Sequence, residues 1–216
     1  MNKEQIINET IEHIKKNIIG DSGHDWWHVY RVWKTAVQIA EEEKADIFVV
    51  QLAALLHDIA DYKFHGGDHT VGPKVAREFL QNMTVEENII NHICDIIQNM
   101  SFKGAGVESK MATKEGMIVQ DADRLDALGA IRIARCFSYG GFKKRIMFDP
   151  SIKPRMHYSV DEYLRGDGTT INHFYEKLLL LKDKMNTKTG QRLAQERHEF
   201  LLKFLEQFYK EWDVEK

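Results

Sequence analysis

The sequence predicts an all-α protein, and three observations lead to that prediction. Apolar residues recur three and four positions apart along most of the chain, which is typical of amphipathic helices. Only three prolines occur in 216 residues, so long stretches contain nothing that would interrupt a helix. No segment sustains the alternation of apolar and polar residues that a half-buried strand shows. We therefore expect a compact helical bundle.

Five apolar stripes predict the helices of the N-terminal half. The first stripe ends at Gly20, and the second runs into the charged segment Glu41–Lys44. Pro73 lies near the start of the fourth helix, where proline is tolerated. The stripes cover, in order, residues 7–18, 29–40, 49–60, 75–80 and 85–96.

The C-terminal half predicts three more helices. One is expected over about 113–136, and two long helices over about 170–186 and 189–213 form a helical hairpin. The segment from Asn186 to Gly190 would turn the chain between the two arms.

Two segments do not fit a helical pattern. Residues 99–112 are short and contain glycine, and residues 138–159 contain two glycines and two prolines. The second segment also carries five basic residues against one acid, in a chain whose net charge is −3. A loop of this length is more often functional than not, so it is expected to be either a lid that binds polyphosphate or a solvated basic face.

Composition limits the classes of partner. The negative net charge gives no general attraction to nucleic acid or to an anionic membrane. The first residues are too polar for a signal peptide, and no run of eighteen apolar residues occurs. Cys94 and Cys136 stand far apart, which fits buried thiols in a reducing cytosol better than a disulfide or a thiolate zinc site. We expect a cytoplasmic protein with no membrane partner and no stable nucleic-acid partner.

Histidine and aspartate gather in three segments. His28 closes the run GHDWWH, His57-Asp58 follows an apolar run, and aspartates 121, 123 and 126 share a later segment. Polar groups at the edge of a buried surface need partners, and a shared cation would provide one. Two imidazoles and two carboxylates suit Mn²⁺, Fe²⁺, Co²⁺, Ni²⁺ or Mg²⁺ better than structural zinc, and such a site permits metal-assisted hydrolysis.

Together the three segments resemble the HD-domain superfamily of metal-dependent phosphohydrolases. The runs GHDWWHVYRV, ALLHDIAD and DADRLDALGAI look most like its small stand-alone bacterial hydrolases. The resemblance implies that one divalent metal, with manganese favoured, is bound by His28, His57, Asp58 and Asp123. Asp123 is preferred to the neighbouring aspartates because it occupies the aspartate position of the family's A-D-x-L run.

The same resemblance suggests catalytic residues. Several HD phosphohydrolases place an acid where Asp61 stands, and that carboxylate would move a proton; the alternative is a helix-end ion pair. Arg31 and Arg124 would either neutralise phosphate oxygens or form ordinary ion pairs. Asp126 would bind no metal itself and would orient a ligand residue instead. Asp25 would orient a ligand histidine or favour the helix dipole. Whether His65, His69 and His92 join the site stays open.

The expected function is hydrolysis of nucleotides, with nucleoside triphosphates and pyrophosphate release as the first choice. Alternatives are nucleoside monophosphate or cyclic-nucleotide hydrolysis, and a non-catalytic module that senses a nucleotide. A single domain is expected over residues 1–216, with the metal-site core at about 20–136, the basic loop at 138–159 and the C-terminal helices at 170–213. A homodimer is one option for its assembly.

Overall fold

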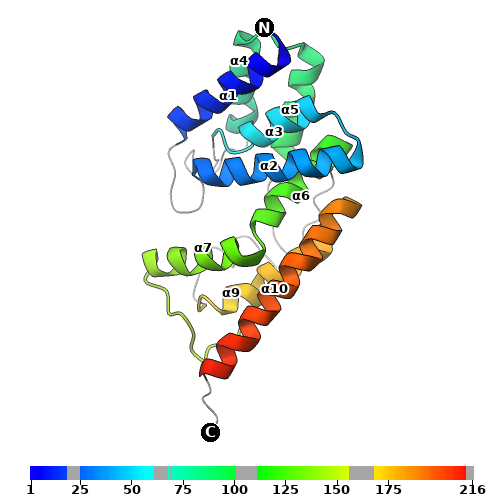
Figure 1. Ribbon diagram of the computed structural model, residues 1–216. Coiled ribbons are helices and arrows are strands. Elements are labelled where there is room, and N and C mark those ends of the chain that lie inside the picture. Colours follow the sequence, from blue (N-terminus) through cyan, green and yellow to red (C-terminus); the bar gives the residue numbers. More distant parts are fainter. Residues whose placement is uncertain (19–24, 61–67, 69, 101–110, 156–167, 213–216) are drawn as a thin grey trace. The chain divides into compact units, whose positions relative to one another are not determined.

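The computed structural model describes residues 1–18, 25–60, 68, 70–100, 111–155 and 168–212 (Figure 1). Within these ranges all regular secondary structure is helical and no strand occurs, which confirms the all-α prediction. None of the helices in the described ranges is long and apolar enough to cross a membrane. The chain divides into two compact units, the first ending at Asp123 and the second beginning at Arg124. The expectation of one domain over residues 1–216 stays a prediction.

Unit 1 is built around one helix that is apolar on all sides. Helix α3 packs against α1, α2 and α5, and α4 packs against α5. Every side chain of α3 from Phe48 to Leu56 except Gln51 is buried, as expected of a helix surrounded by others. The unit contains α1 (Lys3–Asn17), α2 (Trp26–Glu43), α3 (Ile47–Leu56), α4 (Val71–Asn82), α5 (Glu87–Asn99) and most of α6 (Lys114–Asp126).

The N-terminal helices follow the predicted stripes closely. Pro73 is the third residue of α4, as its position in the sequence indicated. The third stripe is an exception, because α3 ends at Leu56 and residues 57–60 are turns. The chain leaves the helix there, at the point where polar groups replace apolar ones.

Unit 2 has an aromatic core. Rings of Phe137, Phe174 and Phe204 lie within 6.2 Å of one another, centroid to centroid. The unit contains α7 (Gly129–Phe142), α9 (Asn172–Glu176), the 3₁₀-helix η2 (Leu178–Lys184) and α10 (Lys188–Trp212).

The single helix predicted over 113–136 is wrong. Two helices, α6 and α7, occupy this stretch and are separated by Ala127 and Leu128. The break comes at Gly129, whose φ of +79° is accessible to glycine and costly for other residues. The aliphatic stem of Arg197 lies against Gly129, where a Cβ would come within 3.2 Å of it.

The irregular segment predicted over 138–159 begins too early. Helix α7 continues to Phe142, because Gly140 serves close packing rather than a turn: a Cβ there would lie 2.4 Å from Thr170 Oγ1. Beyond α7 the chain is tied to residues 170–176, with Thr170 N–H donating to the Ile146 carbonyl at 2.9 Å. The Asn172 amide donates to the Ile152 carbonyl, and Arg155 N–H donates to Glu176. Residues 156–159 lie outside the described ranges, and the lid stays a prediction.

The first arm of the expected C-terminal hairpin is also different from the prediction. It is a five-residue α-helix followed by a 3₁₀-helix, whereas the second arm is the expected long helix α10. Lys177 breaks the first arm with φ −141° and ψ −56°. In a 3₁₀-helix residues three apart share one side, which lets Leu178 and Leu181 both be buried.

Candidate metal centre

The start of α2 fixes the backbone of His28. Asp25 is the N-cap residue, and its Oδ1 accepts a hydrogen bond from His28 N–H at 2.8 Å. Such a cap satisfies a helix N–H that would otherwise lack a partner. Asp25 therefore holds His28 through the main chain, while the His28 side chain is buried.

The end of α3 presents His57 and Asp58. His57 Nδ1 lies 2.8 Å from the Ala54 carbonyl oxygen, so Nδ1 carries the proton and donates it to the carbonyl. In the neutral imidazole this leaves a lone pair on Nε2, the atom that can bind a metal. A backbone carbonyl is a common partner for the outer nitrogen of a metal-binding histidine.

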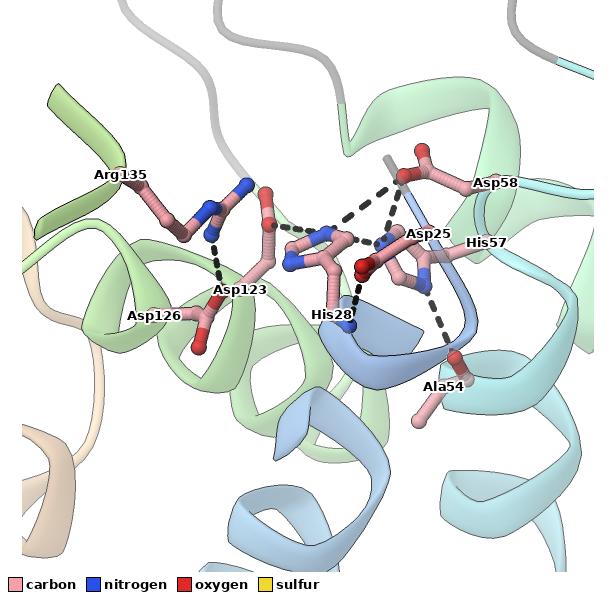
Figure 2. Close-up of polar contacts among 8 residues, drawn as sticks. All are labelled: Asp25, His28, Ala54, His57, Asp58, Asp123, Asp126 and Arg135. Atoms are coloured by element: carbon pink, nitrogen blue, oxygen red, sulfur yellow. Dashed lines mark hydrogen bonds and ion pairs between the residues drawn. The ribbon is translucent and has the colours of Figure 1, made fainter. Parts of the chain in front are cut away.

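The candidate ligands from α2, from the turn after α3 and from α6 lie close together in unit 1 (Figure 2). His57 Nε2 lies 3.3 Å from His28 Nε2, and each of the two nitrogens lies 3.5 Å from Asp58 Oδ2. His28 Nε2 also lies 3.6 Å from Oδ1 of Asp123, which comes from α6.

These separations fit a shared cation. Ligand atoms about 2.0–2.2 Å from one ion lie about 3 Å apart when adjacent and about 4.2 Å apart when opposite. The observed 3.3–3.6 Å falls within that range, and the candidate atoms of His28, His57 and Asp58 all lie within 4.8 Å of one another. Nitrogen and carboxylate donors together suit a borderline divalent metal.

The other two aspartates near the end of α6 have different settings. Asp121 is fully buried, and Asp126 forms an ion pair with Arg135 of α7 (Figure 2). Asp123, partly exposed, is the one found beside His28. The role of Asp123 as a metal ligand, expected from the A-D-x-L run, stays a prediction.

The expected phosphate-binding arginines lie in different settings. Arg31 is half-buried on α2, one turn after His28. Arg124 donates a hydrogen bond from its guanidinium to the Lys184 carbonyl. Their roles toward phosphate stay predictions, as does the role of Asp61, which lies outside the described ranges together with His65 and His69.

His92 has a separate setting. Its Nε2 lies 2.8 Å from Thr113 Oγ1 and 3.9 Å from a carboxylate oxygen of Glu115. In the part of the chain that the structure describes, the group of potential metal ligands contains His28, His57 and Asp58, and it includes neither His92 nor Asp123, whose contact with the group is with His28. The geometry gives no support for His92 as the ligand of a second metal.

Sequence reasoning missed the arginines around the end of α6. Arg135 pairs with Asp126, and Arg197 donates to the Leu125 carbonyl at 2.5 Å. These contacts join residues up to 72 positions apart, so no local sequence pattern predicts them. The one available signal was the spacing of Arg132 and Arg135, which places two cations on one side of α7.

Comparison with known proteins gives a consistent result. The family model "HD domain" matches residues 26–128. YpgQ of Bacillus subtilis is 42% identical over 193 residues, which cover 88% of this chain and 85% of YpgQ. An HD-superfamily hydrolase from Bacillus thuringiensis superposes with a TM-score of 0.80 and 43% identity, over 99% of this chain and 100% of that one.

A structure of YpgQ in complex with ADP also superposes on the chain. Its TM-score is 0.74 and its identity 32%, with 98% of this chain and 97% of YpgQ covered. The matched region spans all four candidate ligands, from His28 to Asp123. The chain belongs to the HD-domain superfamily of metal-dependent phosphohydrolases.

Proposed function

We propose that this hydrolase acts on nucleoside triphosphates, releasing pyrophosphate and leaving the nucleoside monophosphate. One divalent metal, with Mn²⁺ favoured, would be held by His28, His57, Asp58 and Asp123. The observation that carries the proposal is the convergence of the ligand atoms of His28, His57 and Asp58 at 3.3–3.5 Å, with Asp123 3.6 Å from His28.

The nucleotide part of the proposal has a separate support. The related YpgQ has been crystallised with ADP, and it covers nearly the whole of this chain. ADP contains a base, a sugar and a pyrophosphate group, so a site that accepts it also matches most of a triphosphate. A metal centre next to such a nucleotide site would lie beside the phosphoryl groups of the bound nucleotide.

The reaction needs one water and no other co-reactant. The water oxygen attacks the α-phosphorus, and the bond from that phosphorus to the oxygen bridging to the β-phosphate breaks. Pyrophosphate leaves with the bridging oxygen, and the water contributes the new oxygen of the monophosphate.

The metal and the surrounding residues would have separate roles in this reaction. A divalent ion at this place would supply Lewis acidity and lower the pKa of adjacent water. Asp61 would accept the proton of the attacking water. Arg31 and Arg124 would offset the negative charge that gathers on the phosphoryl oxygens.

The decisive experiment offers Mn²⁺-loaded protein a panel of nucleoside mono-, di- and triphosphates and cyclic nucleotides. Products are identified by ³¹P NMR, and ¹⁸O-water shows which phosphorus is attacked. We expect triphosphates to give pyrophosphate, with ¹⁸O in the monophosphate, and we expect Asp58→Ala to abolish turnover. His13→Ala, on α1 of the same unit, is the matched control and should keep full activity.

Other outcomes would replace the proposal. Release of inorganic phosphate and a nucleoside would show a monophosphatase, and opening of cyclic nucleotides would show a phosphodiesterase. Tight nucleotide binding without turnover by verified metal-loaded protein would show a sensing module.

A further inference from the structure

Helix α2 carries aromatic side chains on its solvent side, and Trp27 is the most exposed of them. Its side chain is 60% exposed and that of Tyr30 is 37% exposed, whereas Val29 and Val32 of the same helix are fully buried. Among the described residues of unit 1, no other large apolar side chain has so large an exposed fraction as Trp27. An indole left in water forgoes a large favourable burial, so its place beside a functional centre needs an explanation.

Neighbouring rings hold the Trp27 side chain without covering it. The Trp27 and Tyr30 ring centroids lie 5.8 Å apart at an interplanar angle of 79°, and the Tyr30 ring lies 6.0 Å from that of Trp33. Trp33 Nε1–H donates to Gln51 Oε1 of α3 at 3.1 Å, which ties this row of rings to the next helix. Because the Tyr30 ring is nearly perpendicular to the indole, it contacts at most one indole face. The other face remains accessible to a planar ligand.

The position of Trp27 on α2 relates it to the metal centre in the same unit. At about 100° per residue, Arg31 lies about 60° around the helix from His28, and Trp27 lies about 40° further in the same direction. Trp27 and Arg31 are four residues apart and are therefore neighbours on the helix surface. Exposure rises in the same order, from the buried His28 through the half-buried Arg31 to Trp27.

This order matches the parts of a nucleotide. The phosphates need a metal and a cation, as offered by the centre at His28 and by Arg31. The base is joined to the phosphates through a sugar, so it lies to one side of them and further towards solvent. Its flat face is weakly polar, and an indole is a surface on which any base can stack.

We propose that Trp27 is the base-stacking residue of this site, on which the nucleobase lies while the phosphates occupy Arg31 and the metal centre. The inference deepens the proposed nucleotide function and rests on it. Since every base has a π-face, Trp27 selects nucleotides over base-free polyphosphates and discriminates little among the bases.

The test compares two probes that differ only in the nucleoside: α,β-methylene-ADP and methylenediphosphonate. Neither can be cleaved between its phosphorus atoms by water, and their dissociation constants for Mn²⁺-loaded protein are measured by isothermal titration calorimetry. Trp27→Ala should raise the constant of α,β-methylene-ADP about tenfold and leave that of methylenediphosphonate unchanged. Trp212→Ala, which removes an exposed indole from α10, is the matched control and should change neither constant.

A spectroscopic measurement identifies stacking itself. At constant Mn²⁺, α,β-methylene-ADP should quench the tryptophan fluorescence of the parent protein. Trp27→Phe should abolish most of that quench and keep most of the affinity, because a phenyl ring also stacks on a base.

The two probes separate the possible failures. Equal losses for both probes in Trp27→Ala would make Trp27 a structural residue, and unchanged constants with an unchanged quench in Trp27→Phe would place the base elsewhere. Either result overturns the stacking role and leaves the nucleotide function intact. If the parent protein binds methylenediphosphonate as tightly as α,β-methylene-ADP, the nucleotide function fails first and the stacking role with it.

Discussion

The end of α3 and the end of α6 both present candidate metal ligands, but different forces hold them. The end of α3 follows a helix whose side chains are almost all buried and apolar. The end of α6 also has buried apolar residues, Ala122 and Leu125, and arginines add charged contacts there by donating to a carbonyl or pairing with a carboxylate. Apolar packing spreads the support over many contacts, whereas a few charged contacts concentrate it. The two ends should therefore respond differently to substitution.

The largest effect is expected from removing a ligand at the end of α3. His57→Ala should abolish Mn²⁺ retention and turnover together, because it removes the nitrogen that lies 3.3 Å from His28 Nε2 and 3.5 Å from Asp58 Oδ2. Metal content is measured by plasma emission spectroscopy and turnover by phosphate or pyrophosphate release. Full activity of a verified metal-free His57→Ala protein would disprove the metal centre.

The next effect concerns the residue that follows this helix end. Asp61→Asn should keep the metal but lower kcat about 10²–10⁴-fold, the usual scale for a lost general acid or base. The readouts are metal stoichiometry and kcat measured on the same preparation. Loss of metal would make Asp61 a ligand, and unchanged turnover would make it structural.

A loss of apolar packing around α3 should lower the stability of the protein and leave its metal affinity nearly unchanged. Leu52→Ala removes a fully buried side chain of α3 and should cost about 2–5 kcal/mol of unfolding free energy. The folded fraction should bind Mn²⁺ almost as the parent does, since the many remaining contacts keep the helix in place. Urea unfolding and Mn²⁺ titration measure the two effects, and a large loss of affinity would remove the distinction between the two helix ends.

Gly129→Ala should also lower stability, by a smaller amount. The new Cβ meets Arg197 at 3.2 Å and strains a positive φ, so the expected cost is about 1–3 kcal/mol of unfolding free energy. Gly129 and Arg197 both belong to unit 2, whereas the candidate ligands belong to unit 1, so Mn²⁺ affinity should stay the same. The matched control is Gly141→Ala, at a position of α7 where a Cβ would meet nothing within 4 Å. Urea unfolding and Mn²⁺ titration measure the two effects, and an unchanged stability of Gly129→Ala would contradict this account.

The parts of the molecule that sequence could predict are those set by local pattern. Apolar spacing predicted the helices of unit 1, and the His and Asp runs predicted residues that the structure brings within 3.6 Å. Buried stripes and polar residues at their ends follow from the chemistry of a few neighbours along the chain. The grouping of His57 and Asp58 with the distant His28 came from the family resemblance instead, and their role as ligands stays a prediction.

Two of the wrong predictions concern glycines that contact residues distant in the sequence. Gly140 was predicted to belong to a loop, but it packs against Thr170 within α7. Gly129 begins α7 with a positive φ, beside the stem of Arg197. The first arm of the hairpin is a short α-helix followed by a 3₁₀-helix, in which Leu178 and Leu181 are both buried. The cysteines, by contrast, were predicted correctly: both are buried, and burial raises the pKa of each thiol.

The hydrogen bond from His57 Nδ1 to the Ala54 carbonyl affects which substitutions position 54 can accept. Its acceptor belongs to the main chain, so replacing Ala54 by glycine or serine does not delete it. The ion pair between Asp126 and Arg135 differs, because both partners are side chains and a single codon change at either position removes it. In a saturation library selected for activity, position 54 should accept any residue small enough for its buried place. Positions 126 and 135 should accept few.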